Sequence, residues 1–224
     1  MRIDRRAFVI GAPLAVAGCA SQREMIVAQP GPTIDPYYRA MYDELPDEKH
    51  PVDAVDLTQI DERFLRREVS FSTSEPAGTV IVDPNARYAY LVLGGGKAIR
   101  YGVGVGKTEA FNFNGAAIIG RKAEWPHWTP TAKMVAREPE RYGPVAAGMQ
   151  GGEDNPLGAR ALYLYRNGSD TFYRLHGTTE PYSIGTMVSS GCIRFLNQDI
   201  IDLYNRVPVG SRVIVRPARA TAAA

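Results

Sequence analysis

The chain has 224 residues, of which 45% are hydrophobic, and this size and composition fit one ordinary globular domain with extensions. Its formal net charge is +2, and residues 1–18 alone carry three arginines and one aspartate, so the rest of the chain is close to neutral. Such a balance leaves no basic surface for nucleic acid, and this class of partner is excluded.

The N-terminus has the pattern of an export signal. Arg5 and Arg6 precede an apolar run of about a dozen residues, whereas a membrane-spanning helix needs roughly twenty. The run ends in small residues directly before Cys19, which fits a signal peptide over residues 1–18.

Two short motifs refine this prediction. The stretch around Arg5 and Arg6 resembles a twin-arginine signal, and Val-Ala-Gly before Cys19 resembles a bacterial lipobox. The resemblance implies that Cys19 is lipidated and that the protein is periplasmic, anchored to a membrane of the bacterial envelope. The alternative is a plain secretory signal in which Cys19 is incidental. If Cys19 carries lipid, Cys192 has no partner within the chain and a disulfide scaffold is excluded.

Residues 19–77 are rich in proline and charge and are predicted to be a tether with short ordered pieces. Residues 37–45 and 60–67 have some apolar periodicity, but neither is long enough to form a helix that is stable alone.

From residue 78 the pattern changes to short β-branched and aromatic runs separated by turns. Residues 79–85, 87–93 and 98–105 are predicted strands. Two later runs flank Asn167-Gly168, a pair suited to the positive φ angles of a tight hairpin. That hairpin would place His176 at the end of a strand.

One helix is predicted after Cys192, with Asn197 as N-cap and an apolar stripe on one side. Pro208 and Gly210 should end it, residues 211–215 should form a closing strand, and residues 218–224 a tail. We therefore expect a mainly β fold, a sandwich or barrel with one packed helix after the cysteine.

Cys192 and His176 are the candidate catalytic pair. A thiol is mostly protonated at neutral pH, so it needs a nearby base to become a nucleophile. Gly191 allows a sharp bend, which would turn the amides of Gly191 and Cys192 toward a developing oxyanion. The alternative is an inert buried thiol beside a hydrogen-bonded histidine. His50, in the predicted tether, and His127, in a predicted loop, are less well placed as bases, and the chain offers too few ligands for a structural zinc site.

These residues resemble a known catalytic signature. His176-Gly177-Thr178 followed by Ser189-Ser190-Gly191-Cys192-Ile193-Arg194 is similar to that of the L,D-transpeptidases, the YkuD domain. Further similarity lies in the runs that begin at Asp83, Trp125 and Asn155, so the resemblance covers residues 78–217. At residue 190 many members have histidine, but serine also occurs in the family.

The resemblance implies a function and roles for these residues. Cys192 would attack a peptidoglycan stem tetrapeptide to form a thioester, with His176 as base and no metal or organic cofactor. The acyl group would then pass to a diamino-acid side chain of another stem, or to a wall-attached protein. Supporting roles would fall to Gly177, Ser189, Ser190 and Gly191. Substrate-binding roles would fall to Thr178, Tyr182, Trp128 and Arg194. Arg194 could equally hold the loop, and packing is an equal role for Tyr182.

Two other classes of function stay open from the sequence. One is an L,D-carboxypeptidase or cross-link hydrolase on the same scaffold, in which water resolves the thioester. The other is a non-catalytic wall-binding lipoprotein.

Overall fold

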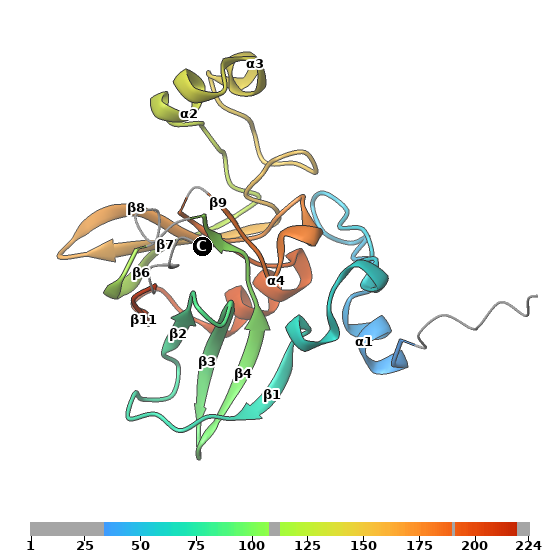
Figure 1. The fold of residues 1–224 in the computed structure, drawn as a ribbon, viewed down its shortest axis with the longest axis vertical. Coiled ribbons are helices and arrows are strands. Elements are labelled where there is room, and N and C mark those ends of the chain that lie inside the picture. The colour runs from blue at the N-terminus through green and yellow to red at the C-terminus, as the bar shows by residue number, and fades with distance from the viewer. Residues whose placement is uncertain (1–33, 108–112, 190, 219–224) are drawn as a thin grey trace, which may run out of the picture. The chain divides into compact units, whose positions relative to one another are not determined.

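The computed structural model describes residues 34–107, 113–189 and 191–218, and Figure 1 shows their fold. The predicted signal peptide, Cys19, Ser190 and residues 219–224 lie outside the described residues. Within these ranges, no helix has the length and apolar character that crossing a membrane requires.

Residues 34–70 contain four short elements, which are α1 (Pro36–Met41), η1 (Leu57–Gln59), η2 (Glu62–Phe64) and β1 (Arg67–Ser70). Helix α1 begins where the Asp35 carboxylate accepts a hydrogen bond from the amide of Tyr37, with proline at the first helical position. The apolar periodicity of residues 60–67 does not produce an α-helix, because that stretch forms a 3-10 turn and the start of a strand.

The structure also corrects the predicted tether for residues 34–70, which pack as part of the domain. Strand β1 pairs antiparallel with β4 (Lys97–Gly102). Tyr42 is 1% exposed, donates a hydrogen bond from its hydroxyl to Asp199 and accepts one from the amide of Arg66. The reason lies in the composition of this segment, whose aromatic residues bury apolar area between proline-rich turns.

Within the described residues, the main sheet has nine strands in the order β1-β4-β3-β2-β11-β6-β7-β8-β10. Besides β1 and β4, this sheet contains β2 (Val80–Asp83), β3 (Tyr88–Gly94), β6 (Gly115–Glu124), β7 (Arg160–Arg166), β8 (Ser169–His176), β10 (Ile193–Arg194) and β11 (Arg212–Val215). The pairs β2/β11 and β8/β10 are parallel and the others antiparallel. The predicted hairpin is confirmed, since Asn167 and Gly168 both have positive φ, 51° and 78°.

The two ends of the sheet come together. Gly104, just after β4, forms an antiparallel bridge with Arg194 of β10, and β5 (Val105–Gly106) pairs with β9 (Met187–Ser189) in a second small sheet. The sheet therefore curls around one core, whose buried residues come from strands on both sides and from α4 (Asn197–Arg206). The prediction of a mainly β, sandwich-like or barrel-like fold is confirmed.

Helix α4 is the predicted helix after Cys192, with one correction at its start. Asn197 is the first helical residue and Leu196 the N-cap. The Asn197 side chain instead accepts a hydrogen bond from the amide of Ala159 at 3.0 Å. Ile200 and Leu203 are fully buried, so the helix is held by its apolar side.

Between β6 and β7 the chain forms α2 (Ala132–Arg137), α3 (Pro139–Tyr142) and η4 (Gly143–Val145), and Figure 1 shows α2 and α3 projecting from the sheet at the top of the view. The short η5 (Pro181–Ser183) follows β8. The fold therefore has more helical pieces than the single helix that the sequence predicted.

Candidate functional site

His176 and Cys192 lie on neighbouring parallel strands. His176 is the last residue of β8, and Cys192 directly precedes β10, whose Ile193 is opposite Leu175. Leu175 and Ile193 are almost completely buried, so apolar packing fixes the two strand ends. The fold thus brings together two residues that are sixteen positions apart in the sequence.

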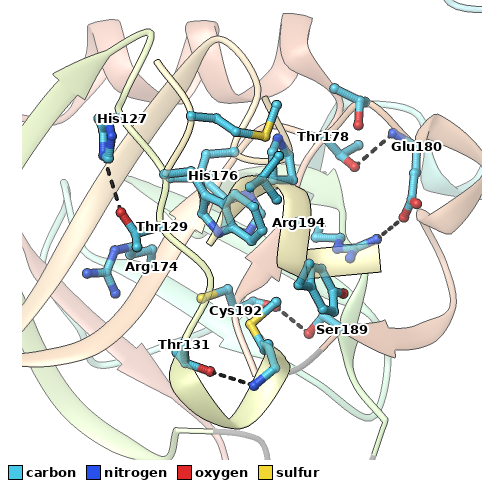
Figure 2. A pocket seen from close by; sticks show the side chains of 18 of the residues that line it. His127, Thr129, Thr131, Arg174, His176, Thr178, Glu180, Ser189, Cys192 and Arg194 are labelled. Atoms are coloured by element: carbon cyan, nitrogen blue, oxygen red, sulfur yellow. Dashed lines mark hydrogen bonds and ion pairs between the residues drawn. The ribbon is translucent and has the colours of Figure 1, made fainter. Parts of the chain in front are cut away.

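A cavity of about 720 Å³ contains both side chains in its wall. Four other predicted site residues line the same cavity, namely Trp128, Thr178, Ser189 and Arg194. Figure 2 shows His176 and Cys192 in the middle of this wall, with Arg174 on one side of the view and Arg194 with Glu180 on the other.

The imidazole of His176 is held as a neutral base. Its side chain is buried, and its Nδ1 lies 2.6 Å from the carbonyl oxygen of Gly177. Burial lowers the pKa of His176 to about 3, and the charge of Arg194 adds to this shift. Because a carbonyl only accepts, Nδ1 carries the hydrogen of the neutral ring and Nε2 has the free lone pair. The Gly177 carbonyl is therefore one group that orients His176, and the backbone of Leu157 also hydrogen-bonds this side chain; the sequence alone identified neither.

The thiol of Cys192 is half-buried and unpaired. Burial raises the pKa of Cys192 above its ordinary value, while the charge and a backbone hydrogen bond of Arg174 oppose this shift. The resting pair is thus a thiol beside a neutral imidazole, and the thiol must lose its proton during attack.

Ser189 holds the backbone around the cysteine. Its hydroxyl donates to the carbonyl of Cys192 at 2.6 Å and accepts the amide of Gly191 at 3.1 Å. Gly191 has a φ of 131°, which side-chain-bearing residues rarely adopt, so the sharp bend predicted at this glycine is present. Its amide, however, donates to Ser189, so of the two amides predicted to face an oxyanion only that of Cys192 remains a candidate.

Gly177 of the His-Gly-Thr motif has a packing role. A β-carbon at this position would overlap the side-chain oxygen of Asn197. The glycine therefore lets α4 and the end of β8 approach closely.

Arg194 makes the contacts that its predicted loop-holding role requires. Its Nη1 donates to Glu180 at 2.6 Å, and Thr178 Oγ1 accepts the amide of Glu180 at 3.0 Å. Arg141 also reaches Glu180, at 3.4 Å. Arg194 nevertheless lines the cavity, so its guanidinium contributes charge to the site.

Tyr182 is not brought to the cavity: it is 60% exposed and is absent from the cavity wall. Trp125 is buried and packs edge-on against His50, with 4.9 Å between the ring centroids. His127 also lines the cavity.

Sequence reasoning missed Glu180, Arg121 and Arg174, all of which line the cavity. Arg174 could have been found, because residues two apart on a strand point to the same side and His176 follows it by two. Arg121 and Glu180 gave no such signal. In the described part of the chain, no three side chains of the metal-ligating types are grouped to hold a metal ion.

The curated relatives are consistent with this arrangement. The probable L,D-transpeptidase YbiS of Escherichia coli strain K12 is 39% identical over 147 residues, which cover 64% of this chain and 46% of that protein. A putative L,D-transpeptidase of Fuscovulum blasticum is 43% identical over 101 residues, 45% of this chain and 49% of that protein. The chain spans about half the length of these relatives.

Among solved structures, a protein of Brucella melitensis described as a probable carnitine operon oxidoreductase is 45% identical, with a TM-score of 0.49. The match covers 70% of this chain and 96% of that one. The model of the YkuD family, the L,D-transpeptidase catalytic domain, matches residues 77–215, well over half of the chain. This chain therefore belongs to the YkuD family of L,D-transpeptidase catalytic domains.

Proposed function

We propose that the protein is a peptidoglycan L,D-transpeptidase with Cys192 as nucleophile and His176 as general base. The observation that carries this proposal is the pairing of a neutral, buried imidazole on β8 with the cysteine that precedes β10, in the wall of one cavity. Membership of the family supplies the substrate class, and the chemistry follows from the residues.

In the first half-reaction the Cys192 sulfur would attack the carbonyl carbon between an L-centre and the terminal D-residue of a stem tetrapeptide. His176 Nε2 would take the thiol proton as the carbon–sulfur bond forms. The carbon–nitrogen bond would then break, His176 would return the proton to the leaving amine, and a thioester and a free D-amino acid would result.

In the second half-reaction a diamino-acid side-chain amine would attack the thioester. The new carbon–nitrogen bond replaces the carbon–sulfur bond, His176 takes a proton from the amine, and the thiol recovers it. The amide of Cys192 would stabilise the oxyanion in both steps, an interaction worth about 3 kcal/mol. Ser189 and Arg194 would position the loop, because they hydrogen-bond Cys192 and Glu180.

The test is incubation of the protein with muropeptides that carry tetrapeptide stems, followed by separation of the products. Transfer predicts dimers linked through two diamino acids, with loss of one D-amino acid for each link. Tripeptide monomers without dimers would instead identify an L,D-carboxypeptidase, and an unchanged result with Cys192→Ala would identify a non-catalytic binding protein. Adding a wall-attached protein as acceptor tests whether the acyl group is transferred to a protein.

The export signal and the lipobox-like residues before Cys19 support a periplasmic, lipid-anchored location for this activity. Cys19→Ala should release the protein from the membrane fraction. Membrane retention of that variant would contradict the anchor.

A further inference from the structure

A row of three side chains crosses the sheet beside the catalytic pair. On β6, β7 and β8, Arg121 is opposite Tyr163 and Tyr163 is opposite Arg174. Both arginines line the cavity that contains Cys192. We propose that this arginine pair binds a carboxylate of the donor stem peptide. The inference rests on the proposed function, since that function supplies an acidic peptide.

The tyrosine holds the two cations in place. The guanidinium carbons of Arg121 and Arg174 lie 3.5 and 4.7 Å from the centroid of the Tyr163 ring, which is 3% exposed. Cation–π contacts of this kind fix a guanidinium plane without using its N–H donors. The donors of Arg121 therefore stay available to a ligand.

The arginines on the cavity wall differ in whether a carboxylate lies within ion-pair distance of them. Arg194 is paired with Glu180, and Arg174 lies 3.5 Å from Asp170. Among the residues that the structure describes, no carboxylate lies within ion-pair distance of Arg121. Arg121 is thus the cation on this wall that a substrate anion would satisfy, and a guanidinium matches a carboxylate with two parallel hydrogen bonds.

The strand order indicates which carboxylate can reach it. Three strand spacings of about 4.8 Å separate β10 from β6, so the Arg121 backbone lies roughly 14 Å from that of Cys192. An extended arginine covers about half of this distance. The bound carboxylate must then lie several covalent bonds from the attacked carbonyl.

That distance disfavours the carboxylate of the leaving D-residue, which is only three bonds from the attacked carbon. It favours a carboxylate that stays with the acyl-enzyme. Two sources share this chemistry, the distal carboxylate of an acidic diamino acid and the free carboxylate of the acidic residue before it. The experiment below separates them.

The test measures binding, so that it does not depend on turnover. The full chain carrying Cys192→Ala is titrated calorimetrically with four synthetic tetrapeptides: the free acid, and forms amidated at the diamino acid, at the preceding acidic residue, or at the terminal D-residue. Arg121→Gln is compared with Arg100→Gln, a matched control whose guanidinium lies 4.4 Å from the Tyr88 ring outside the cavity.

We expect amidation at one of the two stem positions to weaken binding by about tenfold or more, the size typical of a charge-assisted hydrogen bond. Arg121→Gln should weaken binding of the free acid by the same factor, and this variant should no longer distinguish the free acid from that amidated form. Arg100→Gln should change neither the affinity for the free acid nor this discrimination. Arg121→Lys should keep part of the affinity, which separates loss of charge from loss of fold.

The proposed subsite would be overturned if Arg121→Gln weakened the binding of the acid and of every amide by the same factor. It would also be overturned if Arg121→Gln had no effect on binding. The proposed function fails separately: it falls if the wild-type protein turns over no stem peptide, even when binding still discriminates the acid from the amide. Turnover without any dependence on Arg121 would retain the function and reject the subsite.

Discussion

The guanidinium of Arg194 meets the carboxylate of Glu180 with 2.6 Å between Nη1 and Oε2, at the wall of the cavity that contains Cys192. Both side chains are partly exposed, so solvent weakens the contribution of this pair to stability. Its importance lies in geometry, because Arg194 follows Cys192 by two residues and Glu180 follows His176 by four. The pair ties the segment after the base to the strand after the nucleophile.

A double-mutant cycle tests this tie. Arg194→Ala and Glu180→Ala should each lower kcat/KM for the tetrapeptide donor by about tenfold, since small displacements of catalytic groups are costly. The double variant should be no worse than the worse single variant. Arg141→Ala is the control, because Arg141 is 61% exposed and lies farther from Glu180. Fully additive effects would contradict the tie.

Ser189→Ala should damage both the loop and the activity. The substitution removes the acceptor of the Gly191 amide and the donor to the Cys192 carbonyl, with an expected destabilisation of about 1–3 kcal/mol. Turnover should fall as well, whereas KM should change less. Ser183→Ala is a matched control, since Ser183 is buried but its hydroxyl has no hydrogen-bond partner among the described residues. Equal melting temperatures for the two variants would contradict this role.

The sequence predicted the parts of the fold that depend on local patterns. The Asn167-Gly168 turn and the helix after Cys192 follow from backbone preferences and apolar periodicity, and both are present. Cys192 and His176 stand out by their side-chain chemistry, and the resemblance to the family then implies their roles.

The rest depends on contacts between distant residues. Tyr42 lies in a segment without strong periodicity, and its hydroxyl hydrogen-bonds Asp199, 157 positions later. Arg121 and Arg174 become neighbours only because β6, β7 and β8 pair in one register. No local pattern encodes such pairings.

The rate at which Cys192 reacts with an alkylating agent should rise with pH, as it does for a thiol that is protonated at neutral pH. Since the pKa of Cys192 is raised by burial, its alkylation by iodoacetamide should still be accelerating above pH 8. Arg174→Gln should slow the reaction at each pH, because the charge of Arg174 favours the thiolate. Intact mass spectrometry follows the modification, with Cys192→Ala as the blank. A plateau of reactivity near pH 5 would instead indicate a thiolate–imidazolium pair.

Tyr42→Phe tests whether residues 34–70 are part of the domain. Removal of the hydroxyl leaves the Arg66 amide without its acceptor and Asp199 without a donor, so we expect a loss of about 1–3 kcal/mol in unfolding free energy. Tyr37→Phe is the control, because Tyr37 is 63% exposed. Chemical denaturation of both variants measures the difference, and indistinguishable midpoints would indicate a dispensable segment.

Asp199 should make stability depend on pH. Burial raises the pKa of Asp199 to about 7, against an opposing charge from Arg66 and a hydrogen bond from Tyr42. Between about pH 4 and pH 7 the folded state then binds a proton that the unfolded state has lost. The corresponding stability is fully present below pH 4 and is lost as the pH rises through 7.

Asp199→Asn should therefore gain stability relative to the wild type across that window, because an amide has no charge to bury. His176 acts in the opposite sense: its folded pKa of about 3 lies below the ordinary value, so its contribution is lost as the pH falls. Comparing the two proteins at each pH cancels the His176 effect, since both contain it.

Asp202→Asn supplies the contrast. Burial would raise the pKa of Asp202, but hydrogen bonds from Arg206 and Tyr101 and the charge of Arg66 lower it on balance. That variant should lose stability above pH 4 and not gain it. Urea denaturation at pH 4, 5.5, 7 and 8 measures both differences. Parallel curves for Asp199→Asn and wild type would show that Asp199 is ionised in the folded protein throughout, since its carboxylate would then lack the raised pKa.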